Sequence, residues 1–214
     1  MTDWELALFI DQKRTSDLTS VESSAVLRLY EASFPVEERE DPAYLLADSR
    51  DKRILVAHSE ADLVGFALLV SLAPAPYDLL EYIAVEPEMR SRGVGTRLLD
   101  CVAKIAKTKH GTLGLVLEVE EPASARDPAL AARRIDLYLR WGATDIPCLR
   151  RYFMPNLSTG KGVVPMRLLH RASGSASPPP TGDALRELLS RLYEVEYPDR
   201  AANLVPTLLS HVIC

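Results

Sequence analysis

The sequence predicts a mixed α/β fold of the α+β type, in which a mostly antiparallel sheet is flanked by helices. Short apolar runs in the first 171 residues alternate with segments of helical periodicity, as expected of one layered domain. Two of these runs are joined by the polar tip EAD, which is typical of a β-hairpin. A stretch rich in Pro, Ser and Gly follows, and a second helical pattern comes after it.

The N-terminal half reads as a strand, two helices and three further strands. Apolar periodicity in SVESSAVLRLYEASF predicts a helix that Ser20 caps. Pro87 ends the last of these strands, because proline has no N–H for a sheet hydrogen bond. The expected elements are a strand at 4–10, helices at 20–34 and 42–49, a hairpin of strands at 53–59 and 62–73, and a strand at 78–85.

The C-terminal half alternates helices with strands. A helix is expected at 96–111, with Gly111 as its C-cap, and a second helix at 128–141 ends before Gly142. Apolar residues share one face of the first helix: Leu98, Leu99, Val102, Ala103 and Ala106. A buried strand is expected at 113–120, and two paired strands at 148–154 and 163–171.

Three regions follow from these patterns. Residues 1–171 form the main domain, residues 172–182 a flexible linker, and residues 183–214 a helical extension. Four leucines share one face of the extension: Leu185, Leu188, Leu189 and Leu192. Two short helices alone bury too little surface to be stable, so we expect this face to pack on the main domain or on a second subunit in a homodimer.

Composition excludes several classes of protein. The 214 residues carry a net charge of −5, which argues against non-specific binding of nucleic acid and slightly favours cationic partners. No apolar run is long enough to span a membrane and the N-terminus does not resemble a signal peptide, so we expect a cytoplasmic protein. The histidines show no metal-ligand spacing, and the odd number of cysteines without a CxxC pair predicts reduced thiols and no metal site.

The stretch VEPEMRSRGVGTRLL has the features of an anion site at the start of a helix. A helix N-terminus offers unpaired N–H groups and partial positive charge, which favour phosphate. Gly93 and Gly95 let a ligand approach the backbone, and Arg90, Arg92 and Arg97 add positive charge. The same glycines also fit a tight strand-to-helix turn with no ligand, and the sequence has neither a P-loop nor a dinucleotide-binding motif.

In its order of motifs the chain resembles the GNAT superfamily of acyl-CoA-dependent N-acyltransferases. The residues YIAVEPEMRSRGVGTRLL match the V-x-P-x-x-R-x-x-G-x-G motif of that family. The later segments LVLEVEEP and RRIDLYLRWGA resemble the strand and helix that follow it. The resemblance covers residues 1–171 and implies a sheet whose central strands are splayed apart to admit the acyl donor.

The resemblance also implies a binding site for acetyl-CoA, used as a co-substrate without a metal. The backbone around the helix start would hold the CoA pyrophosphate: Arg90, Ser91, Arg92, Gly93, Val94, Gly95 and Thr96. The preceding strand would pair with the pantetheine arm through Ile83, Ala84 and Val85, and an N–H there would polarise the thioester oxygen.

Three residues are candidates for the chemistry of acyl transfer to an amine. Glu118 occupies the LEV position that supplies the base in the ribosomal-protein acetyltransferases, and Glu81 lies on the neighbouring splayed strand. Neighbouring carboxylates raise one another's pKa and attract a cationic amine. Tyr138 matches the family's helix tyrosine, which donates a proton to the departing thiolate. The alternative for each glutamate is a solvated or ion-paired charge, and for Tyr138 a packed aromatic ring.

The acceptor is the part of the function that the sequence defines least. We expect a primary amine of a small molecule or amino acid, because of the net acidity and because EPASARDP (121–128) is an extra segment that we expect to reshape the acceptor pocket. The turn FPVEERE lies where the family forms part of its acceptor site, so Phe34, Glu37, Glu38 and Arg39 are candidates for substrate contact or for an ordinary surface turn. Two alternatives stay open: a protein or peptide N-acetyltransferase, and a catalytically inactive CoA-binding regulatory protein.

Overall fold

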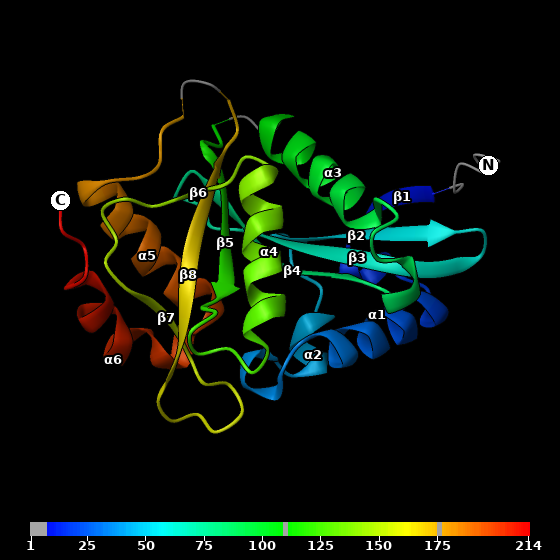
Figure 1. Ribbon diagram of the computed structural model, residues 1–214, viewed down its shortest axis with the longest axis horizontal. Coiled ribbons are helices and arrows are strands. Elements are labelled where there is room, and N and C mark those ends of the chain that lie inside the picture. Colours follow the sequence, from blue (N-terminus) through cyan, green and yellow to red (C-terminus); the bar gives the residue numbers. More distant parts are fainter. Residues whose placement is uncertain (1–7, 109–110, 175–176) are drawn as a thin grey trace.

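The computed structural model describes residues 8–108, 111–174 and 177–214. Its main elements in chain order are β1 (Leu8–Lys13), α1 (Ser20–Ser33), α2 (Pro42–Leu45), β2 (Lys52–Ser59), β3 (Asp62–Ser71), β4 (Tyr77–Val85), α3 (Val94–Thr108), β5 (Gly114–Glu120), α4 (Pro128–Arg140), β6 (Thr144–Asp145), β7 (Tyr152–Pro155), β8 (Val163–Ala172), α5 (Gly182–Glu196) and α6 (Pro198–Leu209). Figure 1 places α5 and α6 at one end of the molecule and the β2–β3 hairpin at the other.

The strands of the described residues form one eight-stranded sheet in the order β1-β2-β3-β4-β5-β8-β6, and β7 also pairs with β8. Its pairs are antiparallel except β4 with β5, which run parallel. The expected hairpin of β2 and β3 and the expected pairing of β7 with β8 are both present. The predicted fold class, a mostly antiparallel mixed sheet with flanking helices, is therefore confirmed.

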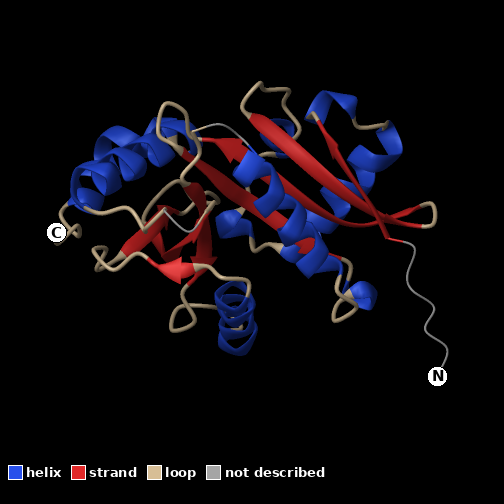
Figure 2. Ribbon diagram, turned by 90° about the horizontal axis from the view of Figure 1, so that it is seen from above, coloured by secondary structure: helices blue, strands red, loops and turns tan. Residues whose placement is uncertain are grey.

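Helices cover both faces of the sheet (Figure 2). On one face, α3 and α4 pack against apolar residues such as Leu69, Leu80 and Leu117. On the other face, α1 and α2 pack near β2 and β3, and α5 and α6 pack near β4, β5 and β7. The alternation of β5 explains how both faces are filled, because Leu117 faces α3 and α4 while Val116 faces α5 and α6.

The helical extension packs on the sheet of its own chain. Its four leucines are fully buried and share a cluster with Leu79 and Val116 of the central strands. Of the two expectations for this apolar face, the structure has the main domain and not a second subunit. Burial of these side chains supplies the stabilisation that two isolated short helices lack.

A disulfide joins Cys148 to Cys214, with their Cα atoms 5.5 Å apart. The expectation that all three cysteines are reduced thiols is therefore wrong for these two, and only Cys101 among the described cysteines is free. The sequence did not predict this pairing, because 66 residues separate the two cysteines. The fold brings the C-terminus beside Cys148, whose carbonyl accepts a hydrogen bond from the Ile213 N–H at 2.9 Å.

Several element boundaries differ from the prediction: the helix expected at 42–49 ends at Leu45, and the strand expected at 148–154 is Tyr152–Pro155. The cap of α1 is Thr19 and not Ser20: its hydroxyl accepts from the Glu22 N–H, while the Glu22 carboxylate accepts from the Thr19 N–H. The first strand begins at Leu8, and residues 4–7 of the expected strand lie outside the described residues, as do 109–110 of the expected helix. No helix in the described ranges combines the length and the apolar character needed to cross a membrane.

Candidate active site

The two central strands part where the candidate glutamates lie. β4 and β5 pair from Tyr77 with Gly114 as far as Leu80 with Leu117, and then diverge. Glu81 and Glu118 are the first residues beyond the last pair, one on each strand. Sequence resemblance had implied such a splayed sheet, and the register places both carboxylates at the apex of the gap.

A bulge in β4 contributes to the position of Glu81. In the pairing of β3 with β4, Leu68 opposes Tyr82 and Leu69 opposes Leu80, so that Glu81 has no opposing residue. A bulge adds a residue to one strand and turns its side chain, and such bulges are common beside functional sites. Beyond it Ile83 and Val85 line the same cavity as Glu81.

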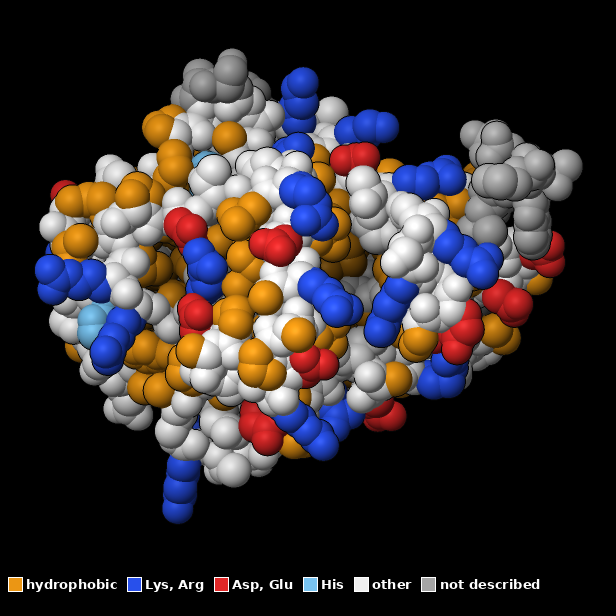
Figure 3. Space-filling view, in the orientation of Figure 1, with side chains coloured by type: hydrophobic (Ala, Val, Ile, Leu, Met, Phe, Trp, Pro, Cys, Tyr) orange, Lys and Arg blue, Asp and Glu red, His pale blue; other side chains and the backbone are white. Residues whose placement is uncertain are grey.

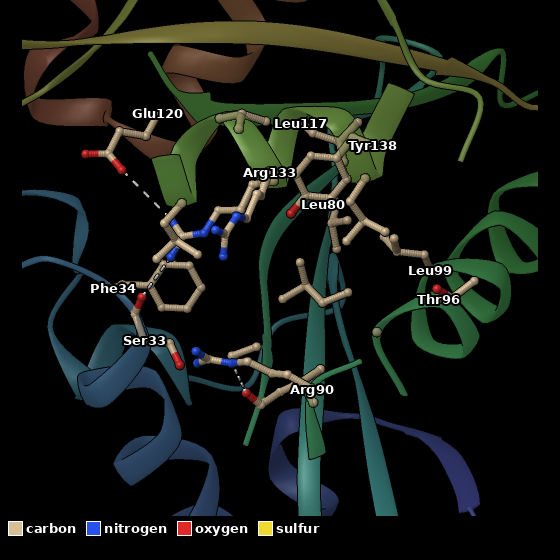
Figure 4. A pocket seen from close by; sticks show the side chains of 18 of the residues that line it. Ser33, Phe34, Leu80, Arg90, Thr96, Leu99, Leu117, Glu120, Arg133 and Tyr138 are labelled. Atoms are coloured by element: carbon tan, nitrogen blue, oxygen red, sulfur yellow. Dashed lines mark hydrogen bonds and ion pairs between the residues drawn. The ribbon is translucent and has the colours of Figure 1, made fainter. Parts of the chain in front are cut away.

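A cavity of about 650 Å³ occupies the gap between the parted strands. Its walls come from the end of α1 and the turn after it, from both parted strands, from the start of α3, and from α4. Figure 4 shows Tyr138 and Arg133 extending from α4 into this space, with Phe34 and Arg90 across from them. On the molecular surface the hollow is bordered by Lys and Arg side chains (Figure 3), and Arg90, Arg133, Arg134 and Arg140 are among its lining residues.

The start of α3 fits a phosphate group. Gly93 has φ +83° and its missing side chain leaves open space, so the backbone there is exposed to a ligand. The first N–H groups of a helix have no partner within it, and Gly93, Gly95 and Thr96 all line the cavity. Arg90 closes the turn by donating from Nε to the Val85 carbonyl at 3.1 Å. The backbone and charge of this region therefore suit the pyrophosphate that the resemblance implies.

Most of the residues predicted for the donor site line the cavity, and two do not. The residues predicted for the pantetheine arm and most of those predicted for the pyrophosphate are present in its wall: Ile83, Ala84, Val85, Arg90, Ser91, Gly93, Gly95 and Thr96. The side chain of Val94 packs into the core, and Arg92 is exposed outside the lining. The extra segment was expected to reshape the pocket, yet of residues 121–127 none is part of this lining.

Glu118 is held by two tyrosines. The Tyr152 hydroxyl donates to Glu118 Oε1 at 2.5 Å, and the Tyr197 hydroxyl donates to Oε2 at 2.9 Å. Burial raises the pKa of Glu118 to about 6, although both hydrogen bonds favour its charged form and act in the opposite direction. Each oxygen keeps a second lone pair for a ligand, so the group is a carboxylate of fixed orientation at neutral pH.

Glu81 faces a second carboxyl group, that of Glu196 at the end of α5. Both Glu81 oxygens and one Glu196 oxygen are buried and have no donor among the described residues, so the two acids can be joined only by a proton that one of them carries. Burial raises the pKa of Glu81 to about 7 and that of Glu196 well above its usual range, and their mutual repulsion adds to the shift in Glu196. The pair therefore retains a proton near neutral pH.

Tyr138 lies on the α4 side of the cavity. Its ring packs against the apolar cluster that α3 and α4 form with Leu80 and Leu117 of the sheet. Its hydroxyl makes no hydrogen bond with any residue in the described ranges, and the residue lines the cavity. Burial raises the pKa of Tyr138 to about 12, with Arg134 acting in the opposite direction. The phenol is therefore protonated at neutral pH and available as a donor.

Three contributors to the site were not predicted as such: Tyr152, Tyr197 and Glu196. For Tyr152 both pocket lining and core packing were considered, with core packing favoured, and the other two residues lie in the extension, outside the region that the resemblance covers. One signal existed, because Glu196 falls at the next position of the helical face formed by Leu185, Leu189 and Leu192. A carboxylate on an otherwise apolar face indicates a buried polar partner.

Metal ligation has no candidate in the described ranges, where no group of three or more His, Cys, Asp or Glu side chains is placed to hold an ion. Glu120, the second carboxylate of β5, lies 3.9 Å from an Arg134 guanidinium nitrogen and lines the cavity. Arg134 also reaches the Ser33 carbonyl at 3.5 Å, which ties α4 to the end of α1.

Comparison with known structures shows similar folds. A putative acetyltransferase of the GNAT family from Bacteroides thetaiotaomicron is 22% identical, with a TM-score of 0.62 over 95% of this chain and 99% of that one. The ribosomal-protein-S18-alanine N-acetyltransferase of Escherichia coli is 19% identical, with a TM-score of 0.56 over 78% of this chain and 96% of that one. Arabidopsis thaliana NAA60, solved with a bisubstrate analogue, is 18% identical, with a TM-score of 0.57 over 77% and 98% of the two chains.

Comparison of sequences identifies the family. No curated protein matches this chain. The family model described as "Acetyltransferase (GNAT) family" matches residues 23–134, which is more than half of the chain and includes the parted strands and the start of α3. The chain therefore belongs to the GNAT acetyltransferase family, and its enzyme class is that of an acyltransferase.

Proposed function

We propose that the protein transfers an acetyl group from acetyl-CoA directly to the primary amine of a small molecule or amino acid. The observation that carries this proposal is the convergence of Glu118 and Tyr138 on one cavity, in the gap where β4 and β5 part. The cavity also opens to the start of α3, where Gly93 and the first N–H groups of the helix suit the CoA pyrophosphate. Acetyl-CoA, when bound, supplies the activated acetyl thioester.

Glu118 is the better candidate for the base. A base must be deprotonated at working pH and held in a fixed orientation, and Glu118 meets both conditions through a pKa of about 6 and two tyrosine hydrogen bonds. Glu81 shares a proton with Glu196, which makes it a weaker acceptor at neutral pH. In this scheme Glu118 receives a proton from the acceptor's ammonium group, directly or through a water molecule, and the neutral amine so formed attacks the thioester carbonyl carbon.

Tyr138 is the candidate acid. Its phenol is protonated at neutral pH and faces the cavity from α4. A thiolate has a pKa of about 8.5, below that of the phenol, so the tyrosine acts by hydrogen bonding or by donating while the leaving group is still forming. In this scheme a backbone N–H near Ile83, which lines the cavity, polarises the carbonyl oxygen of the donor.

Thiol release from acetyl-CoA, measured against a panel of small amines, tests this proposal. We expect amine-dependent release by the wild type, and a kcat about a hundredfold lower in Tyr138→Phe with little change in acetyl-CoA affinity, because the ring is kept and only the proton donor is lost. Tight CoA binding without any amine-dependent thiol release would favour the inactive regulatory protein instead. An unchanged kcat in Tyr138→Phe would remove the tyrosine from the chemistry.

A further inference from the structure

Glu38 is a buried carboxylate in the wall of the same cavity, and its role is not explained by the transfer chemistry. It ends the short turn Val36–Glu38 after α1 and is 8% exposed. Its backbone carbonyl accepts from the Tyr82 hydroxyl at 3.0 Å, which fixes the turn against β4. In contrast, no hydrogen bond or ion pair joins its side chain to any residue of the described ranges, and the residue lines the cavity, with Arg134 as the nearest compensating charge.

The charges around Glu38 are mainly negative. Glu120 and Glu118 repel it, Glu37 adds to this, and Arg134 partly offsets them. Arg134 is committed elsewhere, since its guanidinium reaches Glu120 and the Ser33 carbonyl. Burial, with these neighbouring carboxylates, raises the pKa of Glu38 to about 7.

An unpartnered buried carboxylate is costly, and the cost falls when a cation binds beside it. Glu118 differs in this respect, because two tyrosines already satisfy it. Two of the carboxylates in the cavity wall therefore differ: Glu118 is oriented for proton transfer, and Glu38 lacks a hydrogen-bonded positive partner. An ammonium or guanidinium group of the acceptor, away from its reacting nitrogen, would supply the positive partner of Glu38.

We propose that Glu38 forms a second cation subsite, so that the acceptor is an amine carrying a further positive charge, with its reacting nitrogen at Glu118 and its distal cation at Glu38. This inference rests on the proposed acetyl transfer and names the class of acceptor. The distal group stays charged at neutral pH because an alkylammonium has a pKa of about 10.4. A charge-assisted hydrogen bond between this distal cation and the buried Glu38 carboxylate then favours dications over monocations as acceptors.

Matched pairs of acceptors test the subsite. The first arm compares α,ω-diamines with n-alkylamines that have the same number of non-hydrogen atoms, and the second compares peptides that begin with lysine or with norleucine. We expect the wild type to prefer the dication by about ten- to a hundredfold in kcat/KM. The preference should occur in the first arm if the acceptor is a small molecule, and in the second arm if it is a peptide. In Glu38→Gln this ratio should fall to near unity, while Glu31→Gln, which changes an exposed carboxylate of α1 outside the lining, should keep the wild-type ratio.

The outcomes separate this inference from the proposed function. Transfer to amines without any preference in either arm overturns the subsite and leaves the acetyltransferase activity standing. An equal loss on monoamines and diamines in Glu38→Gln also overturns it, because that result assigns Glu38 to proton transfer. No transfer to any amine overturns the proposed function and the subsite together. The wild-type ratio requires no variant, so the test holds even if Glu38→Gln does not fold.

Discussion

The donor and acceptor sides of the cavity are built in different ways. The donor side comes mainly from one continuous segment, the end of β4 and the turn into α3, where Gly93 and Arg90 are three residues apart in sequence. The acceptor side combines the turn after α1, two parted strands, β7 and the end of α5. A short local motif can therefore specify the donor, whereas the acceptor depends on contacts between segments far apart in the chain.

This difference explains what could be predicted from the sequence. The apolar run of β5 and the glycines at the start of α3 are local patterns, and they predicted the strand and the helix. Tyr197 reaches Glu118 across 79 residues, and no local pattern carries that information. The disulfide is a similar case, because its partners meet only after α5 and α6 have packed on the sheet.

The bulge at Glu81 shows another limit of sequence patterns. The sequence placed Glu81 on the strand beside that of Glu118, and it lines the cavity together with Ile83. Alternation alone did not reveal the unpaired position of Glu81 or its contact with Glu196. Consequently the sequence left Glu81 and Glu118 as equal candidates for the base, and their partners now distinguish them.

The largest effect should come from the acceptor side, at Glu118. We expect Glu118→Gln to lower kcat/KM by about a hundred- to ten-thousandfold, because the amide keeps the shape of the side chain and cannot accept the proton. Acetyl-CoA affinity should change little, since the donor site lies mainly at α3. Steady-state kinetics and calorimetric binding check both statements, with Glu121→Gln as the control outside the cavity lining. A loss confined to acetyl-CoA binding would contradict this division of the cavity.

A smaller effect is expected on the donor side, at Gly93. Alanine at φ +83° costs about 1–2 kcal/mol, and this strain opposes the backbone conformation that presents the N–H groups to the ligand. We expect Gly93→Ala to weaken acetyl-CoA binding by about five- to thirtyfold. The matched control is Gly111→Ala, because Gly111 has φ +82°, equally open space and no part in the cavity lining. Equal weakening in both variants would show a general effect on the fold.

The central claim is that Glu118 acts as a base whose charged form is held by a tyrosine of the C-terminal extension. The most direct test is the pH dependence of kcat/KM in the wild type and in Tyr197→Phe. The wild type should lose activity as the pH falls through about 6, where Glu118 becomes protonated.

Removing the Tyr197 hydroxyl destabilises the Glu118 carboxylate, so the pKa of Glu118 rises. The acidic limb of the pH profile, where activity is lost as the pH falls, should therefore move to higher pH by about 1–2 units. Tyr77→Phe removes a phenol hydroxyl at the other end of β4 and should leave the limb in place. A limb that does not move in Tyr197→Phe, in a protein that folds normally, would contradict the account.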